Sequence, residues 1–155
     1  MAERCIEAGF PAGVLNIVQG LGSKVGTAIT AHPDIPAISF TGGTRTGAEI
    51  ARVAAPMFKK LSLELGGKNP TLVFADSDWR NQLDTLVRSA FQNAGQICLC
   101  GSRLLVQGSI YGEFRDAFVS RVRALSVGDP MDPATQLGPL VSQVHFDKVM
   151  ACLVR

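Results

Sequence analysis

Apolar runs bounded by Gly and Pro recur along the chain and predict strands. Residues 14–18 (VLNIV) and 37–40 (AISF) are rich in apolar side chains and carry no charge. Continuous runs of this kind are typical of parallel strands that are covered on both faces. Residues 71–74 (TLVF) and 103–107 (RLLVQ) are two further runs of suitable length. We therefore predict parallel strands in these four places.

Helical segments alternate with these strands. Residues 23–32 are expected to form a short helix with Ser23 as its N-cap. A glycine-rich turn then leads into a helix that should end before Pro56, because the residue before a proline disfavours helical geometry. Further helices are predicted at residues 78–93 and in a segment that ends near Ala124. This alternation predicts an α/β fold with a partial doubly wound parallel sheet.

The predicted helix through Ala124 carries an apolar stripe with steps of three or four residues. The stripe consists of Tyr111, Phe114, Phe118, Val122 and Leu125. Such spacing places side chains on one helix face. We expect this face to lie in the core, where most amphipathic helices bury their apolar side.

Composition excludes several classes of protein. The chain has 155 residues, of which 46% are hydrophobic and 18% are charged, as expected for a globular domain. Its net charge is +2, and its basic residues are scattered, so they do not form the basic patch of a nucleic-acid-binding protein. No apolar stretch reaches the roughly 18 residues of a membrane helix, and the first residues do not resemble a secretory signal. A cytoplasmic protein is the default expectation.

Cysteine and histidine spacing argues against a disulfide framework and a metal site. The four cysteines are unevenly spaced. The two histidines do not have the sequence spacing of metal ligands, either relative to each other or relative to a pair of cysteines. We expect reduced thiols and no bound metal.

Two glycine patterns could hold phosphate groups. The segment GLGSKVG, residues 20–26, approaches the dinucleotide fingerprint, but Val25 replaces its third glycine. The segment FTGGTRTG follows a predicted strand and contains Gly42 and Gly47. Either could simply be a tight turn. Both nevertheless follow predicted strands and precede helices, where free helix amides can bind a pyrophosphate. A nicotinamide cofactor is therefore plausible.

Glu64 and Cys98 are the candidate catalytic pair. Cys98 follows a glycine and precedes a predicted strand, so it should lie in a loop, although a core position is the commoner fate of a single thiol. Glu64 lies between two leucines in the segment LELGGKNP. A carboxylate desolvated by apolar neighbours is suited to moving protons near neutral pH. A thiol nucleophile with such a base suits acyl transfer.

The segments FTGGTRTG, LELGGKNP and GQICLCGSR occur in this order, and with them the chain resembles the NAD(P)-dependent aldehyde dehydrogenase superfamily. The likeness covers essentially the whole chain. Within the family, the segments KKLSLELGGKNP and ICLCGSR are most similar to enzymes that oxidise muconic semialdehydes. The resemblance implies the α/β fold, oxidation of an aldehyde to a carboxylate, NAD as cofactor with NADP not excluded, and assembly of the full-length form as a homo-oligomer.

The resemblance also implies the roles of individual residues. Cys98 would add to the aldehyde carbonyl and Glu64 would activate the water that hydrolyses the thioester. The Cys98 amide would supply half of an oxyanion hole. Many relatives have Ser at the position of Gly43, so phosphate binding here would depend on backbone amides. The residues expected to border the cofactor are Gly22, Ser23, Gly42, Gly43, Gly47, Leu65 and Gly66.

The same resemblance predicts that the chain is an internal fragment. Residues 1–66 would be the C-terminal half of the NAD-binding domain, and residues 67–155 the N-terminal part of the catalytic domain. The upstream Asn of the oxyanion hole has no counterpart here, and Arg155 falls within a helical pattern that has no stop signal. Two hypotheses therefore remain: the core of an aldehyde oxidoreductase, or an inactive fragment that acts as a nucleotide-binding or subunit-interaction module.

Overall fold

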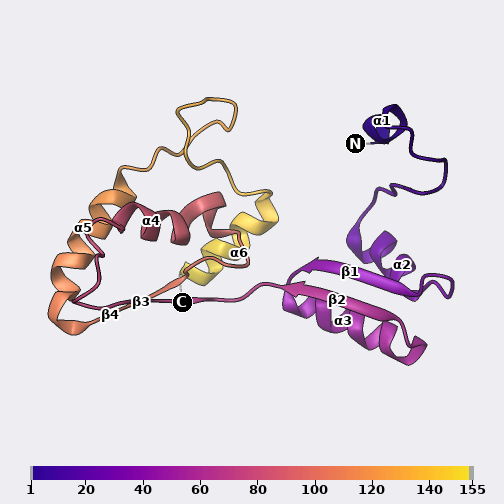
Figure 1. Ribbon diagram of the computed structural model, residues 1–155, viewed down its shortest axis with the longest axis horizontal. Coiled ribbons are helices and arrows are strands. Elements are labelled where there is room, and N and C mark those ends of the chain that lie inside the picture. Colours follow the sequence, from indigo (N-terminus) through magenta and orange to yellow (C-terminus); the bar gives the residue numbers. More distant parts are fainter. Residues whose placement is uncertain (1, 154–155) are drawn as a thin grey trace. The chain divides into compact units, whose positions relative to one another are not determined.

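The computed structural model describes residues 2–153 (Figure 1). The chain divides between Leu65 and Gly66 into two compact units. Each unit is built around one pair of parallel strands. The fold is thus a partial α/β fold with parallel pairing, as the sequence predicts, and the four strands within the described residues form two separate two-stranded sheets.

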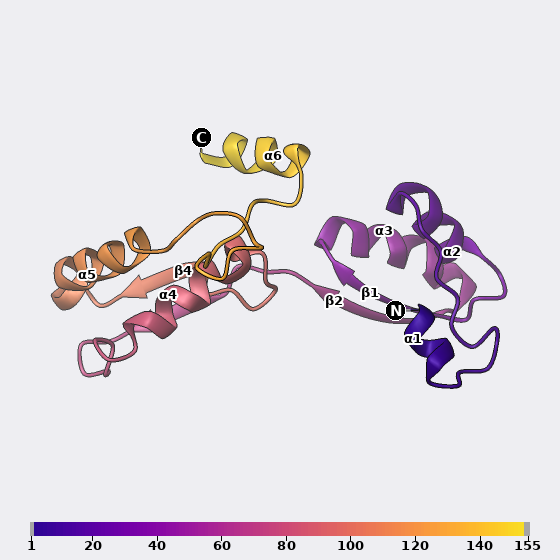
Figure 2. The same cartoon turned by 90° about the horizontal axis from the view of Figure 1, so that it is seen from above.

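The N-terminal unit contains a strand–helix–strand motif. Its elements are α1 (Ala2–Glu7), the π-helical turn η1 (Gly22–Gly26), α2 (Thr27–Ala31), β1 (Ala37–Gly42), α3 (Thr44–Ala54), the 3₁₀ turn η2 (Ala55–Met57) and β2 (Lys60–Leu65). Strands β1 and β2 pair in parallel from Ala37 opposite Lys60 to Gly42 opposite Leu65. Helix α3 connects them and packs along both strands (Figures 1 and 2). It ends before Pro56, as predicted.

The prediction of a strand at residues 14–18 is wrong. This run has no strand structure, and Val14 and Val18 are 63% and 66% exposed. A strand requires a hydrogen-bonded neighbour, and β1 and β2 pair only with each other among the described residues. The predicted N-cap is also wrong, because η1 begins at Gly22 and Ser23 makes no side-chain capping bond.

Lys59 connects the start of β2 to the end of α2. Its side chain is buried, and its ammonium group donates hydrogen bonds to the carbonyl oxygens of Thr30 (2.8 Å) and His32 (2.5 Å). Carbonyl groups at a helix C-terminus lack partners within the helix and carry partial negative charge. The Lys59 charge therefore satisfies the end of α2 and fixes this helix against the sheet.

The C-terminal unit repeats the strand–helix–strand order. Its elements are β3 (Pro70–Val73), α4 (Leu83–Phe91), the 3₁₀ turn η3 (Gln92–Gly95), β4 (Arg103–Val106), the 3₁₀ turn η4 (Gly108–Ile110), α5 (Tyr111–Arg123) and α6 (Gln143–Leu153). Strands β3 and β4 pair in parallel from Pro70 opposite Arg103 to Val73 opposite Val106. The predicted helical pattern through Arg155 reaches beyond the described residues.

Helix α4 is shorter than the predicted helix at residues 78–93. The segment before Leu83 is a turn in which the Asn81 side-chain amide donates to the Asp78 carboxylate at 2.8 Å. After Phe91 the chain enters left-handed backbone conformations, with φ of +53° at Asn93 and +54° at Ala94. Left-handed geometry disfavours continuation of a right-handed helix, so α4 ends before this point.

The core of the C-terminal unit forms where α4 and α5 cover β3 and β4. Trp79 meets Phe114 edge to face with ring centroids 5.3 Å apart, and Phe114 stacks on Phe118 at 5.5 Å. Both arrangements are favoured by the aromatic quadrupole. The predicted stripe on α5 is therefore core at Phe114 and Phe118, whereas Tyr111 is 54% exposed because it lies at the first turn of the helix.

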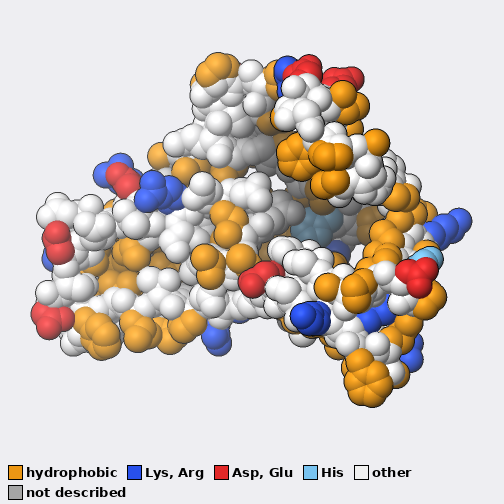
Figure 3. Space-filling view, turned by 45° about the vertical axis from the view of Figure 1, so that its right-hand side comes forward, with side chains coloured by type: hydrophobic (Ala, Val, Ile, Leu, Met, Phe, Trp, Pro, Cys, Tyr) orange, Lys and Arg blue, Asp and Glu red, His pale blue; other side chains and the backbone are white. Residues whose placement is uncertain are grey.

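Many large apolar side chains are exposed on both units. Phe58 is 95% exposed and Met131 86%, and Figure 3 shows hydrophobic side chains spread over the visible face. In β1 and β2 only alternate residues are partly covered, so each of these strands has one covered face. For the strand at residues 37–40 the sequence predicted two covered faces. Within the described part of the chain, no helix has the length and apolar character needed to cross a membrane.

Candidate active site

Cys98 lies at the centre of a tight turn between η3 and β4. The turn is closed by a hydrogen bond from the Cys100 amide to the Ile97 carbonyl oxygen at 3.1 Å. The Cys98 residue is exposed, as expected for a loop position, whereas Cys100 is buried and 4% exposed. The Cys98 amide donates to no acceptor within residues 2–153. One residue thus presents an accessible thiol and an unpaired N–H group.

The chain after Cys98 is held tightly. The Gly101 amide donates to the Ser89 carbonyl oxygen on α4 at 3.1 Å. A Cβ atom at Gly101 would clash with Thr71 Oγ1 on β3, so only glycine fits between these elements. The chain that follows the Cys98 turn is therefore anchored at Gly101 to both α4 and β3.

Asn69 contacts this turn directly, and the sequence interpretation missed it. Its side-chain amide donates to the Cys98 carbonyl oxygen at 3.1 Å. The only available signal was an Asn directly before Pro70, which also suits an ordinary turn. Asn69 and Cys98 are 29 positions apart, so their contact depends on the pairing of β3 with β4.

Glu64 lies on β2 opposite Thr41 of β1. Its side chain is exposed, because exposed and partly buried residues alternate along β2 and the flanking Leu63 and Leu65 are on the other face. The desolvation expected from its leucine neighbours is therefore not found among the described residues. Neighbours in the sequence of a strand point to opposite faces, so the two leucines do not cover the Glu64 carboxylate. Glu64 lies in the N-terminal unit and Cys98 in the C-terminal unit.

The turn between β1 and α3 has the form of an anion-binding loop. Gly43 precedes the helix, with no atom near the place that a side chain would occupy and no side-chain cap. The first hydrogen bond of the helix runs from the Gly47 amide to the Gly43 carbonyl oxygen at 3.0 Å. Within the described chain, the amides of residues 44–46 donate to no protein acceptor. Such amides at a helix start attract phosphate oxygens.

Three of the predicted cofactor residues lie close together at this loop. Gly42 ends β1, Gly47 lies in the first turns of α3, and Leu65 ends β2 directly opposite Gly42. A Cβ atom at Gly47 would lie 2.6 Å from Leu65 Cδ2, so glycine is what allows the helix to approach the strand. Close helix–strand packing is the role of the third glycine of a dinucleotide-binding loop. Gly66 follows β2 and has open space around it.

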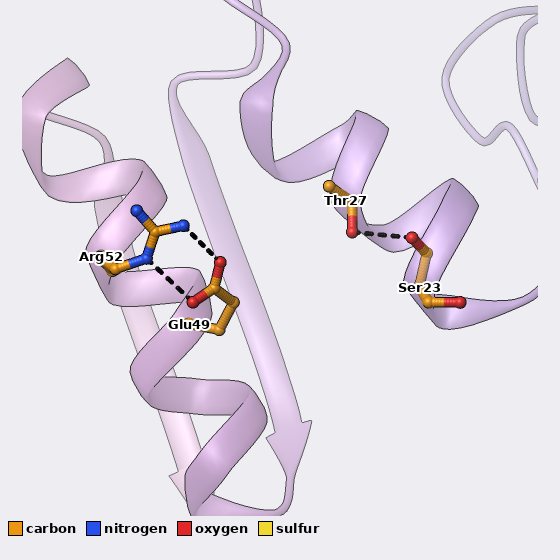
Figure 4. A network of polar contacts seen from close by, with 4 residues as sticks. All are labelled: Ser23, Thr27, Glu49 and Arg52. Carbon is orange, nitrogen blue, oxygen red and sulfur yellow. Dashed lines mark hydrogen bonds and ion pairs between the residues drawn. The ribbon is translucent and has the colours of Figure 1, made fainter.

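Gly22 and Ser23 lie at the start of η1. The Ser23 carbonyl oxygen accepts a hydrogen bond from the Thr27 hydroxyl at 3.1 Å, while the Ser23 hydroxyl has no partner in residues 2–153 (Figure 4). Val25 stands where a third fingerprint glycine was expected, and its Cγ2 atom would clash with a Cβ atom at Gly20. In this loop the close approach is therefore made between Gly20 and Val25.

Helix α3 carries an exposed ion pair between Glu49 and Arg52. Arg52 donates two hydrogen bonds to the Glu49 carboxylate, from Nε at 2.9 Å and from Nη2 at 2.6 Å (Figure 4). The hydrogen bond from Arg52, together with its positive charge, holds the pKa of Glu49 below its ordinary value of 4.5. Both side chains are exposed, so the pair stabilises α3 only modestly.

Comparison with known proteins identifies the family. The model of the aldehyde dehydrogenase family matches residues 1–155. This chain belongs to the aldehyde dehydrogenase family. It is 51% identical over 149 residues to the 2-aminomuconic semialdehyde dehydrogenase of Danio rerio, a match that covers 96% of this chain and 31% of that protein. It is 49% identical to the 5-carboxymethyl-2-hydroxymuconate semialdehyde dehydrogenase of Escherichia coli, with the same coverage.

A solved aldehyde dehydrogenase has the same fold. The crystal structure of betaine aldehyde dehydrogenase from Staphylococcus aureus in complex with NAD+ matches 98% of this chain and 30% of its own, with 39% identity and a TM-score of 0.93. The chain thus spans about a third of the length of the relatives it matches. The family includes dehydrogenases of aldehydes, and the chain has their α/β architecture. Among the described residues, no cluster of His, Cys, Asp and Glu is suited to hold a metal.

Proposed function

We propose that this chain supplies the nucleophile and the base of an enzyme that oxidises an aldehyde to a carboxylate with NAD. The observation that carries the proposal is the geometry of Cys98. In a chain of the aldehyde dehydrogenase family, Cys98 lies exposed on a turn that is followed by the anchored Gly101, and its own amide is unpaired among the described residues. A nucleophile and an oxyanion donor on one residue suit attack on a carbonyl group.

The proposed chemistry starts at Cys98 Sγ. The thiolate adds to the aldehyde carbon, and the oxygen that becomes negative accepts a hydrogen bond from the Cys98 amide. NAD, when bound, supplies the acceptor for the hydride that leaves this carbon. Glu64 then removes a proton from a water molecule, whose oxygen attacks the thioester carbon while the C–S bond breaks. The Cys98 sulfur leaves as a thiolate, the product is released as a carboxylate, and both protons of the water pass to solvent, one of them by way of Glu64. The exposed position of Glu64 leaves its carboxylate free to accept that proton.

The residues of the β1–α3 loop fit a dinucleotide. The open space at Gly43 and the unpaired amides of residues 44–46 suit the pyrophosphate, and the close contact of Gly47 with Leu65 supports the loop. We assign Gly42, Gly43 and Gly47 to the phosphates, Gly22 and Ser23 to the adenosine side, and Leu65 and Gly66 to the nicotinamide side. Residues 1–66 are accordingly proposed as part of the NAD-binding domain and residues 67–155 as part of the catalytic domain.

The substrate is proposed to be a semialdehyde. The support is the names of the relatives from Danio rerio and Escherichia coli, both of which are semialdehyde dehydrogenases at about 50% identity. Such substrates carry an aldehyde and a distant carboxylate. The family resemblance also favours a homo-oligomer for a full-length enzyme of this kind.

The proposal is tested in a chimaera that carries this chain in place of the matching segment of the Danio rerio enzyme. NADH absorbance is followed with NAD and a muconic semialdehyde. We expect turnover that Cys98→Ala abolishes and that Cys100→Ala, a matched change two residues away, leaves within about tenfold of the parent chimaera. Turnover that survives Cys98→Ala in a folded chimaera would refute the proposal.

A second candidate concerns the 155-residue chain by itself. It could act without catalysis, as a nucleotide-binding or subunit-interaction module, and the many exposed large apolar side chains favour this hypothesis. We expect the isolated chain to have little or no dehydrogenase activity, because loss of one oxyanion donor alone typically costs about 100- to 1,000-fold in turnover. Turnover by the isolated chain within tenfold of the chimaera, abolished by Cys98→Ala, would exclude the second candidate.

A further inference from the structure

Cys98 is held less firmly than the residues that follow it. Cys100 is buried and Gly101 is bonded to Ser89, whereas residues 97–99 precede the start of β4 and Leu99 is 78% exposed. On the preceding side, Asn93 and Ala94 adopt left-handed conformations, which are unfavourable for residues other than glycine. The Cys98 turn therefore needs a further restraint to hold one conformation.

Asn69 supplies such a restraint. Its amide donates to the Cys98 carbonyl oxygen at 3.1 Å, and this is the one hydrogen bond from any side chain to residues 97–99 in the described structure. Asn69 is itself fixed, because its carbonyl oxygen accepts from the Arg103 amide at 3.2 Å. The Arg103 side chain also donates from Nε to the neighbouring Lys68 carbonyl oxygen at 3.0 Å. The donor is thus attached to the strand pair and not to a mobile loop.

The hydrogen bond from Asn69 acts on the peptide group between Cys98 and Leu99. A carbonyl oxygen held in one direction fixes the ψ angle of its residue, and with it the direction of Cα–Cβ relative to the loop. An asparagine amide is suited to this task because its NH₂ group donates, whereas an aspartate of the same shape can only accept when ionised. A change of Asn69 to Asp therefore removes the hydrogen-bond donor while it keeps the size of the side chain.

We propose that Asn69 is a positioning residue for the Cys98 nucleophile. It holds the Cys98 turn through the carbonyl oxygen and touches neither the substrate nor the cofactor. The inference rests on the proposed function in so far as Cys98 is the nucleophile. The hydrogen bond from Asn69 to the Cys98 carbonyl oxygen also leads to a prediction that does not depend on catalysis.

The same strand pair provides a matched control. The Gln107 side chain accepts a hydrogen bond from the Ala75 amide at 2.9 Å, at the opposite end of β3 and β4. Gln107→Ala and Asn69→Ala each remove one bond between a side chain and the backbone that links the two strand segments. A difference between them reports on the Cys98 turn and not on general stability.

The kinetic test uses the chimaera described above. We expect Asn69→Asp and Asn69→Ala to lower kcat by about tenfold or more, because small displacements of a reacting group are costly. The KM values for NAD and the aldehyde should change less than threefold, and Gln107→Ala should leave kcat within threefold. Unchanged kcat in both Asn69 variants of an active chimaera would overturn the inference. A parent chimaera without Cys98-dependent turnover would instead count against the proposed function.

A second measurement tests the bond without catalysis. A nitroxide spin label is attached to Cys98 of the 155-residue chain in which the other three cysteines are replaced by serine. We expect the label to be more mobile in Asn69→Asp and Asn69→Ala than in the parent chain, and unchanged in Gln107→Ala. Equal label mobility in the parent, the two Asn69 variants and Gln107→Ala would overturn the inference. This includes the case in which the label is already fully mobile in the parent.

Discussion

Gly47 on α3 and Leu65 on β2 lie so close that a Cβ atom at Gly47 would be 2.6 Å from Leu65 Cδ2. The contact brings the start of α3, with its amides that are unpaired among residues 2–153, against the end of the β1–β2 pair. The loop proposed to bind the cofactor phosphates therefore depends on the absence of a side chain at this position.

Replacement of Gly47 by Val should destabilise the N-terminal unit by about 2 kcal/mol, because an overpacked contact forces Leu65 and the helix apart. Gly43→Val is the control, since a Cβ atom at Gly43 would meet no other atom within 4 Å and the φ of −76° suits any residue. Urea unfolding followed by circular dichroism gives both values. Equal stability of the two variants would contradict the role assigned to Gly47.

Cys98 should react with iodoacetamide well before Cys100 in the folded chain, because Cys98 is exposed and Cys100 is 4% exposed. Peptide mapping after brief labelling measures the order. In the presence of urea the two thiols should be labelled at similar rates, which controls for sequence effects. Labelling of Cys100 ahead of Cys98 without urea would show that the turn is built differently.

Replacement of Lys59 by Met should destabilise the N-terminal unit by about 1.5–3 kcal/mol, the range for hydrogen bonds that involve a charged group. The variant leaves the carbonyl oxygens of Thr30 and His32 without their donor. Lys60→Met is the matched control, because Lys60 is exposed. If thermal unfolding finds the two variants equally stable, the buried ammonium group does not support α2.

The Glu49–Arg52 pair should make stability depend on pH. Since the pKa of Glu49 is lowered in the folded state, its contribution is present above the ordinary value of 4.5 and is lost as the pH falls through the folded value. We expect Glu49→Gln to lower Tm slightly at pH 7, and the difference from the parent chain to shrink as the pH is lowered well below 4.5. Arg52→Gln added to Glu49→Gln should cause no further loss through this pair. A difference in Tm that does not change as the pH is lowered would contradict this origin.

Much of the fold follows from local sequence patterns. The apolar runs predict β1, β3 and β4 to within a few residues, and Pro56 marks the end of α3. These elements depend on properties of adjacent residues. The failed strand at residues 14–18 depends instead on a pairing partner, and no pattern within the run reveals that β1 and β2 pair only with each other among the described residues.

Predictions about the candidate site likewise divide into those that depend on adjacent residues and those that depend on contacts between distant ones. The loop position of Cys98 could be predicted from the glycine before it and the strand after it. The exposure of Glu64 follows from the alternation of faces along a strand, which places Glu64 on the face opposite to the two leucines beside it, and the expectation of a desolvated carboxylate did not take this alternation into account. Asn69 was missed because its contact with Cys98 exists only once β3 and β4 are in register.

The central claim is that Cys98 forms the covalent intermediate and that Glu64 is needed for its hydrolysis. The most direct measurement is mass spectrometry of the chimaera with Glu64→Gln, quenched after mixing with NAD and aldehyde. We expect a burst of about one equivalent of NADH, turnover slowed about 100-fold or more, and an acyl adduct on the peptide that contains Cys98. A Cys98→Ala change in the same background should remove both burst and adduct. An adduct on Cys100, or a full burst without any adduct on the Cys98 peptide, would contradict the account.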